Sequence, residues 1–308
     1  MHIPSAAMAA IMGNPLQVND SHSRYRPRMK TPSFRHLVPS LAILAALSLS
    51  PLPAVAQEVK PIALAVSEGT SGGIDAAAGR KKYAPMAERL SAALGSKVEV
   101  VFVREFAELE KGMKDGRFDF VVARPSDYPA RGLRDYGYQY VANAEPEGHC
   151  MLAVPTGSPI RTLAQLRGKT FVLPEEVAYM TRFCRAELRD KGIDLAREKV
   201  FYVREQGAIP FGLENGIVDV GGMASYSGAI RQWREKGHRV LHESVGQPYM
   251  PVVAGPRVSA EALDLARLTL LGLSADEQGR AFLRQLGIDG FTADGEERLR
   301  ALLEWLGV

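Results

Sequence analysis

The 308-residue sequence has few of the side chains that mark enzymes or metalloproteins. Of its six histidines, only His149, His238 and His242 lie beyond residue 56, and no Cys-x-x-Cys pair accompanies them. His238 and His242 belong to a predicted strand, so their spacing does not place them on one face of a helix. Without acidic or thiol partners at ligand spacing, we expect no metal site.

A phosphate-binding loop is also missing, because no segment has the pattern G-x-x-x-x-G-K-[ST]. The glycine-rich segment 69–73 lacks the lysine of such a loop and reads as a flexible connection. With no reactive group of residues along the chain, we predict no catalytic residues, no cofactor and no enzymatic activity.

The sequence has no apolar run of the roughly 20 residues that a membrane-spanning helix needs. Its main apolar run, 37–49, follows a basic stretch and precedes Ala54-Val-Ala56, the order of a secretory signal peptide. We therefore expect export to the periplasm with cleavage near Ala56. No cysteine near that point offers a lipid anchor. Met29 is an alternative start to Met1, with a disordered extension as the competing explanation.

Strong charge is absent from the part that would be exported. The formal net charge of the whole sequence is +3, but residues 1–56 hold five basic side chains and one acidic side chain. The remainder therefore carries a formal charge of −1. A nearly neutral protein has no electrostatic attraction for nucleic acid, so we expect no such partner.

The only cysteines are Cys150 and Cys184. In an exported protein such a pair can form a lasting disulfide. The alternative is two buried free thiols, and the sequence leaves both open because it does not show whether the side chains converge.

Short, continuously apolar strands alternate with amphipathic helices through the rest of the chain, a pattern of parallel sheets covered on both faces. The pattern begins at Ile62, restarts after the midpoint, and ends in a helical tail from residue 260. Two such series predict an α/β protein with two lobes and a cleft between them.

Several motifs occur in the order typical of one family. They are Y-A-P-M-A-E-R-L at 83–90, G-R-F-D and R-P-S-D-Y within 116–128, L-A-Q-L-R-G-K at 163–169, N-G-I-V-D at 215–219 and L-G-I-D-G-F at 286–291. Each is weak alone, since glycine followed by aspartate is common in turns. Together they resemble the phosphate/phosphite/phosphonate-binding receptors of ABC transporters.

The resemblance implies a type II periplasmic-binding-protein fold in which each lobe is a mainly parallel sheet flanked by helices. The implied lobes are 57–145 plus 248–308 and 146–247, after a signal region 1–56. A monomer would close over a small polar solute by hinge motion and deliver it to an inner-membrane ABC permease, with the ATPase on another chain. The alternative is a sensory or accessory periplasmic protein that works with a non-transporter partner.

The family holds phosphoryl oxygens with a Ser-Thr-Ser run at the start of a helix in the second lobe. Here Glu175-Glu176-Val177 stands in that place, which makes phosphonate or phosphate binding doubtful. The two acids either favour the helix start electrostatically or meet a cationic group of the ligand. Arg124, at the end of a predicted strand, either binds an oxyanion or pairs with Glu175, Glu176 or Asp127. Arg124 opposite the glutamates would suit a zwitterion.

Other predicted ligand-binding residues follow strand ends or helix starts, and three of them have a structural alternative. Ser126 can instead cap a helix, Tyr83 can belong to the core, and Tyr179 can pack beneath the cleft. The complete predicted set is Ser67, Tyr83, Arg124, Ser126, Tyr128, Glu175, Glu176, Tyr179, Gln206, Ser225 and Tyr226.

Overall fold

The computed structural model describes residues 60–69 and 74–308, which alternate between strands and helices. The predicted signal region 1–56 and most of the glycine-rich segment, 70–73, lie outside the described residues. In chain order the elements of the first half are β1 (Ile62–Ser67), α1 (Ala76–Leu94), β2 (Val98–Phe102), α2 (Phe106–Lys114), β3 (Phe120–Ala123), α3 (Asp127–Asp135), β4 (Gln139–Gly148) and β5 (Cys150–Val154).

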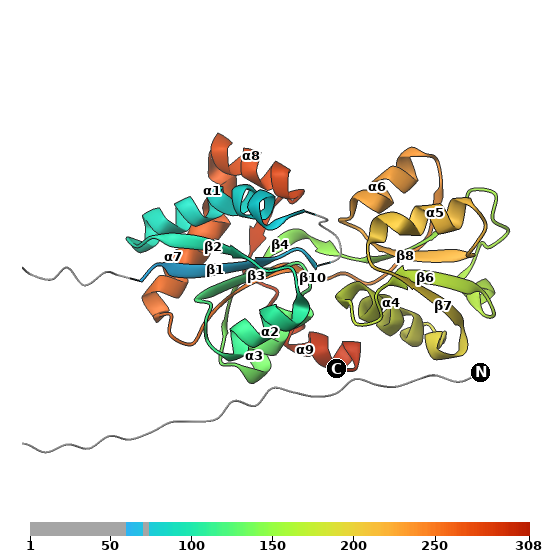
Figure 1. Ribbon diagram of the computed structural model, residues 1–308, viewed down its shortest axis with the longest axis horizontal. Helices are drawn as coiled ribbons and strands as arrows, with labels where there is room; N and C mark the ends of the chain where they lie inside the picture. Colours follow the sequence, from blue (N-terminus) through green and yellow to red (C-terminus); the bar gives the residue numbers. More distant parts are fainter. Residues whose placement is uncertain (1–59, 70–73) are drawn as a thin grey trace, which may run out of the picture. The chain divides into compact units, whose positions relative to one another are not determined.

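The second half continues the alternation and ends in helices, as the sequence predicts (Figure 1). Its elements are β6 (Thr170–Pro174), α4 (Tyr179–Asp190), β7 (Lys199–Val203), α5 (Ile209–Glu214), β8 (Val220–Ala224), α6 (Gly228–Glu235), β9 (Arg239–Glu243), β10 (Gln247–Ala254), α7 (Ala260–Leu271), α8 (Glu277–Leu286), β11 (Gly290–Thr292) and α9 (Glu296–Leu306).

Two sheets divide the strands. The first has the order β11-β4-β10-β3-β1-β2 and so takes strands from both ends of the chain, and the second has the order β7-β6-β8-β5-β9. We call the first sheet with α1, α2, α3, α7, α8 and α9 the first lobe, and the second sheet with α4, α5 and α6 the second lobe. Both belong to one compact unit, Gln57–Val308. The lobe boundaries drawn from the sequence stay a prediction.

The α/β fold with two lobes is as expected, but each sheet is mixed rather than mainly parallel. In the first sheet β1 lies parallel to β2 and β3, whereas β10 runs antiparallel to β3 and β4, and β11 antiparallel to β4. In the second sheet β6 is parallel to β7 and β8, and β5 is antiparallel to β8 and β9. The strands that enter or leave a lobe lack a helical crossover and therefore return antiparallel.

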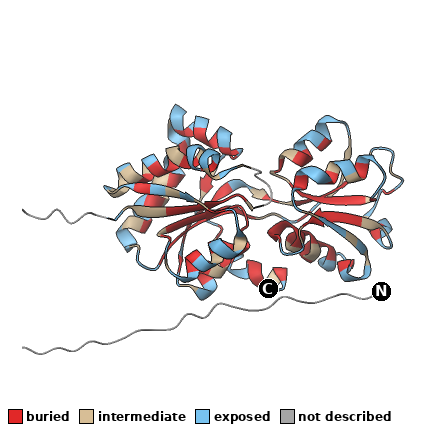
Figure 2. Ribbon diagram, in the orientation of Figure 1, coloured by how far each residue is buried: buried red, intermediate tan, exposed pale blue. Residues whose placement is uncertain are grey.

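Helices cover both faces of each sheet, and burial follows that arrangement (Figure 2). In the first lobe α1, α7 and α8 pack on one face and α2, α3 and α9 on the other. In the second lobe α5 and α6 cover one face and α4 the other. One buried cluster contains side chains of β3 and α9 together with those of β6 and α4, so it is continuous across both lobes.

Cys150 and Cys184, whose pairing the sequence left open, form a disulfide that joins β5 to α4. The two cysteines are 34 residues apart in the sequence, and their Cα atoms are 5.3 Å apart. The approach of α4 to the sheet depends on glycine in β8. A Cβ at Gly222 would overlap Leu173 and come within 3.0 Å of the Cys184 sulfur. Glycine at this position therefore permits close packing around the disulfide.

The described helices include none that is long and apolar enough to cross a membrane. In the same residues, no three His, Cys, Asp or Glu side chains gather where they could hold a metal ion.

Candidate functional site

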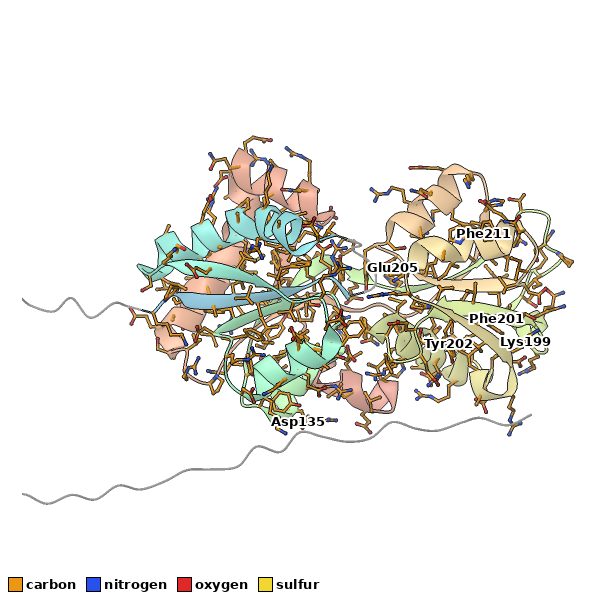
Figure 3. The ribbon with its side chains drawn as sticks, viewed as in Figure 1. Asp135, Lys199, Phe201, Tyr202, Glu205 and Phe211 are labelled. Atoms are coloured by element: carbon orange, nitrogen blue, oxygen red, sulfur yellow. A yellow bond between two sulfur atoms is a disulfide. The ribbon has the colours of Figure 1, made fainter. Side chains whose placement is uncertain are left out.

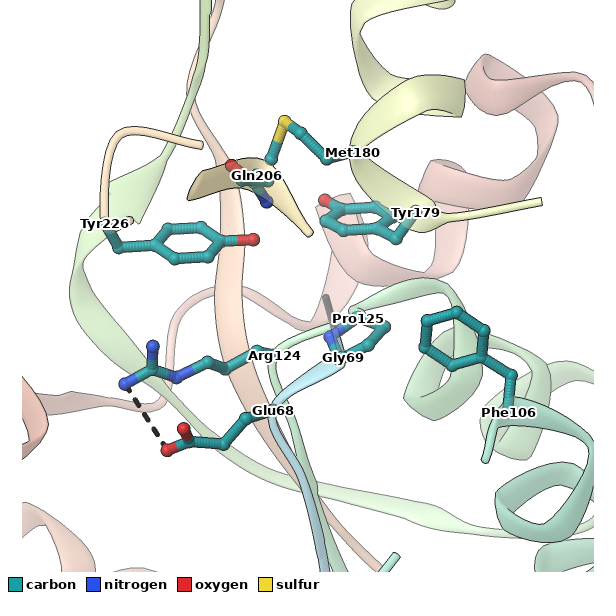
Figure 4. Close-up of a pocket in the computed structure, with 9 residues that line it drawn as sticks. All are labelled: Glu68, Gly69, Phe106, Arg124, Pro125, Tyr179, Met180, Gln206 and Tyr226. Atoms are coloured by element: carbon teal, nitrogen blue, oxygen red, sulfur yellow. Dashed lines mark ion pairs between the residues drawn. The ribbon is translucent and has the colours of Figure 1, made fainter. Parts of the chain in front are cut away.

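Loops that follow strand ends meet between the two lobes and form a small pocket (Figure 4). Glu68 follows β1 and Arg124 follows β3, while Tyr226 follows β8 in the second lobe. The carboxyl ends of strands are where open α/β sheets bind ligands. The lining residues are Glu68, Gly69, Phe106, Arg124, Pro125, Tyr179, Met180, Gln206 and Tyr226.

The inner pocket has a volume of about 10 Å³, which is room for no more than a water molecule. A larger cavity of about 480 Å³ adjoins it and shares Glu68, Arg124 and Tyr226. We call it the outer cavity. Its lining residues are Glu68, Ile74, Lys82, Arg124, Ser225, Tyr226, Ser227, Gly228, Arg231, Arg284, Gln285, Leu286 and Gly287.

A buried network of charges forms the wall between the two spaces. Glu68 Oε1 lies 2.5 Å from Lys82 Nζ and 3.6 Å from Arg124 Nη2, and it accepts a hydrogen bond of 2.8 Å from the Tyr83 hydroxyl. Arg124 also donates from Nη2 to the carbonyl oxygen of Leu286 at 3.1 Å. Glu68 is 3% exposed and Arg124 is 7% exposed, so both charges are held away from bulk water.

The network keeps Glu68 ionised. Burial by itself raises the pKa of the Glu68 carboxyl, but Arg124 and Lys82 outweigh that effect and hold the pKa below its ordinary value. Burial lowers the pKa of Lys82, and repulsion from Arg124 adds to the decrease. The guanidinium of Arg124 stays charged. Its Nε is buried and has no hydrogen-bond partner among the described residues.

Three side chains of the second lobe face this wall. Tyr179 begins α4, and Gln206 lies between β7 and α5, where its Oε1 accepts a hydrogen bond of 2.8 Å from the Ala224 backbone N–H. The hydroxyls of Tyr179 and Tyr226 point toward each other, and the amide nitrogen of Gln206 points between them (Figure 4). The Tyr226 ring stacks on Tyr249 of β10, with ring centroids 4.1 Å apart. The Arg124 guanidinium lies beside these two rings, with its Cζ 5.9 Å from each ring centroid.

The two predicted glutamates lie elsewhere. The helix α4 begins at Tyr179, so Glu175 and Glu176 fall in the turn that precedes it. Glu176 pairs with Arg185 at 3.3 Å, with 65% of its side chain exposed. Neither glutamate lines the inner pocket or the outer cavity. The acidic neighbour of Arg124 is Glu68 rather than either of them.

Asp127, the third partner considered for Arg124, pairs instead with Arg182 of α4 at 2.8 Å. Ser126 precedes α3, but its hydroxyl makes no capping bond to that helix. It donates instead to the carbonyl oxygen of Pro248 at 2.7 Å and so ties α3 to β10. Tyr128 stacks on Phe106 with centroids 5.6 Å apart.

The structure thus brings together Arg124, Tyr179, Gln206 and Tyr226 at the inner pocket and adds Ser225 at the outer cavity. Tyr83 is fully buried and reaches the site only through Glu68. Ser67 is buried, and its hydroxyl has no hydrogen-bond partner in the part of the chain that is described.

Four charged residues of the site are absent from the predicted set. Glu68 and Lys82 each adjoin a predicted residue, Ser67 and Tyr83, so a wider window around the strand end and helix start would have included them. Arg231 and Arg284 lie on helices distant in the sequence, and only the packing of the two lobes brings them to one cavity.

Comparison with known proteins places the chain in a family. Residues 74–297 match the family described as "ABC transporter, phosphonate, periplasmic substrate-binding protein". No curated protein sequence matches the chain.

Solved structures share the fold at low sequence identity. XAC2383 from Xanthomonas citri bound to ATP is 16% identical with a TM-score of 0.65, and the match covers 80% of this chain and 97% of that one. PhnD1 from Prochlorococcus marinus (MIT 9301) in complex with methylphosphonate is 13% identical with a TM-score of 0.64 and the same coverage. The aliphatic sulphonate binding protein SsuA from Escherichia coli is 16% identical with a TM-score of 0.52, covering 80% of this chain and 84% of that one. These likenesses establish the fold.

Proposed function

This chain belongs to the periplasmic substrate-binding proteins of phosphonate ABC transporters, and from that premise we propose that it binds a small organic anion whose acid group is held by Arg124. Members of this family bind small solutes and work with ABC permeases. The observation that carries the proposal is the buried guanidinium of Arg124, which lines both spaces and has an Nε without a partner in the described chain. Buried polar groups are normally paired, and this Nε is available to donate to a ligand.

The charge of the wall favours an anion. Lys82 and Arg124 carry two positive charges against the single carboxylate of Glu68, which leaves one positive charge for the ligand to neutralise. Glu68 is the only carboxylate among the lining residues of either space. It already interacts with Lys82, Tyr83 and Arg124, so a ligand amine would compete with three partners. The zwitterion hypothesis loses support for this reason.

The ligand's acid group would bind in the outer cavity and meet Arg124 beside the Tyr226 ring. Ser225 and Tyr226 line the outer cavity from the second lobe, so that ligand bound there would contact both lobes and favour the closed form. The solved relatives are described with methylphosphonate and as a sulphonate-binding protein. Phosphonate and sulfonate groups are both tetrahedral oxyanions, and their oxygens suit the planar fork of donors that an arginine presents.

Isothermal titration calorimetry with methylphosphonate, methanesulfonate, propionate and arginine tests the proposal. We expect heat with at least one of the three anions and none with arginine. Arg124→Gln should weaken binding of that anion by about 10- to 100-fold, the usual worth of a charged hydrogen bond. Arg124→Lys, which keeps the charge but loses the fork, should weaken it less.

The matched control is Arg300→Gln on α9, where the arginine is exposed and pairs with Glu296. It should leave the affinity unchanged. Far-ultraviolet circular dichroism of each variant checks that it is folded. Unchanged affinity of a folded Arg124→Gln variant, or binding of arginine alone, would refute the proposal.

Membership of this family also supports the remaining properties that we expect from the sequence. We infer a monomer without enzymatic activity or nucleic-acid partner, exported after cleavage near Ala56. Intact mass and light scattering of protein recovered from the periplasm measure both the first residue and the oligomeric state.

A further inference from the structure

The ligand has a second anionic group, we propose, which binds in the outer cavity at Arg231 and Arg284. The inference rests on the proposed function, because the first acid group is the one at Arg124. The outer cavity, at about 480 Å³, lies within the range of small-molecule sites. It is far larger than the inner pocket, so the body of a ligand would lie there.

The outer cavity is strongly basic. Four of its lining residues are cations, and Glu68 is the only lining carboxylate. Arg284 also has an acidic neighbour outside the lining, Glu277 at 2.7 Å. Counting both carboxylates, the cavity keeps an excess of two positive charges. The cations are Lys82, Arg124, Arg231 and Arg284.

Arg231 is the cation whose charge is least compensated. No ion pair or side-chain hydrogen bond of Arg231 occurs in the described residues, whereas Lys82, Arg124 and Arg284 each have a carboxylate within 4 Å. An exposed arginine alone would be an ordinary solvated side chain. Here it lines one cavity together with the buried Arg124, and that shared wall makes it a ligand-binding candidate.

The cations approach the cavity from both lobes. Lys82 is on α1 and Arg284 on α8, both in the first lobe, and Arg231 is on α6 in the second. The helices α8 and α6 stand on opposite sides of the space between the lobes (Figure 1). A ligand that reaches from Arg124 to Arg231 would place one acid group against the first lobe and the other against the second lobe. The second anionic group would therefore add to closure as well as to affinity.

Neutral donors complete the second-lobe wall. Ser225, Ser227 and Gly228 line the cavity, and the Ser227 hydroxyl caps α6 by accepting a hydrogen bond of 3.3 Å from the Ile230 backbone N–H. The positive end of α6 thus adds to the arginine charges. The chemistry fits an organic molecule with two separate acid groups, such as a phosphonate or sulfonate that also carries a second acid.

Matched ligand pairs in isothermal titration calorimetry test the inference. Methylphosphonate is compared with phosphonoacetate, and methanesulfonate with methanedisulfonate, whose charges do not vary with pH. The wild-type protein should bind the doubly acidic member of at least one pair about tenfold or more tightly than its partner. Arg231→Gln should remove most of that preference, because it weakens binding of the doubly acidic member far more than binding of the singly acidic member.

Arg234→Gln is the matched control, since Arg234 is one turn further along α6 and does not line the cavity. It should keep the preference. Arg284→Gln gives a second, independent variant from the first lobe and should reduce the preference in the same sense. Equal affinity for both members of each pair, or equal weakening of both by Arg231→Gln, would overturn the second subsite. Failure of the proposed function gives a different result, namely no binding of any anion or no effect of Arg124→Gln.

Discussion

Single residues organise the space between the lobes through buried charges whose partners are distant in the sequence. Arg124 follows a strand, and this position alone predicted that its side chain would lie in the space between the lobes, because strand ends meet at one edge of a sheet. Its partner Glu68 is 56 residues away and follows a different strand. The sequence offered three other acids as partners, and only the parallel pairing of β1 with β3 selects Glu68.

Asp127 is a second buried charge that the fold places between the lobes. It is fully buried at the start of α3, and its Oδ2 lies 2.8 Å from Arg182 Nη1 on α4. Burial raises the pKa of Asp127 from its usual value near 3.8 to about 6, although Arg182 and Arg131 oppose the increase. The native protein therefore binds a proton at Asp127 more readily than the unfolded chain does.

Asp127 therefore makes the free energy of unfolding depend on pH. The stability that protonation of Asp127 contributes is fully present below pH 3.8, the usual pKa of the carboxyl in the unfolded chain. It is lost as the pH rises through about 6, the pKa in the native protein. Between pH 7 and pH 5 the wild type should gain about 1 to 2 kcal/mol relative to Asp127→Asn, which does not titrate. Urea unfolding of both proteins at each pH measures the difference. Because the other titrating groups are common to both proteins, a constant difference across this range would contradict the prediction.

At the scale of helices and strands, most elements were predicted because their apolar patterns reflect burial on a sheet. The exceptions have physical reasons. The strand β7 lies at the edge of its sheet, and Phe201 and Tyr202 on it are each 42% exposed (Figure 3). An apolar run therefore did not indicate burial on both faces. The three-residue strand β11 has no pattern of its own and exists because it pairs with β4.

The start of α4 also differed from prediction, with consequences for the site. The Thr181 hydroxyl donates to the carbonyl oxygen of Pro174 at 2.8 Å, and this bond closes the turn that precedes the helix. The glutamates of that turn consequently lie outside both cavities. Likewise, Met250 has a φ of 48°, and the register of β10 shifts beside it. Side-chain type at either position does not foretell such local geometry.

The disulfide between β5 and α4 should be the main covalent contribution to stability of the second lobe. Closing a segment of 34 residues restricts the unfolded chain and is worth about 3 to 4 kcal/mol. We expect the Cys150→Ala/Cys184→Ala variant to lose stability of that order in denaturant unfolding. Adding dithiothreitol should destabilise the wild type and leave the double variant unaffected. A loss below about 1 kcal/mol would show that the link contributes little.

The molecule as a whole is held together by contacts that cross between the lobes. The helix α9 belongs to the first lobe but packs against both α3 and α4. Near its end, Trp305 meets Phe183 of α4 edge-on, with ring centroids 5.2 Å apart, and its indole N–H donates to Asp190 at 2.7 Å. Nothing in the sequence of the helical tail indicates that it contacts the second lobe, because its apolar spacing shows only that one face is buried.

These contacts predict that the two lobes unfold together. Calorimetry of the protein should give one transition, with calorimetric and van't Hoff enthalpies in agreement. Trp305→Ala removes a large ring from the shared cluster and should cost about 2 kcal/mol, which lowers the midpoint by roughly 4 to 8 °C for a chain of this size.

Leu268→Ala on α7 is the control for the same measurement, because that leucine is 67% exposed and should change the midpoint little. If α9 joins the lobes as described, Trp305→Ala should also broaden the transition, since the second lobe loses part of its support. Two separate transitions in the wild type, or an unchanged midpoint in the tryptophan variant, would mean that the lobes are stabilised independently. Closure over a ligand would then depend on the connecting strands β4 and β10 alone.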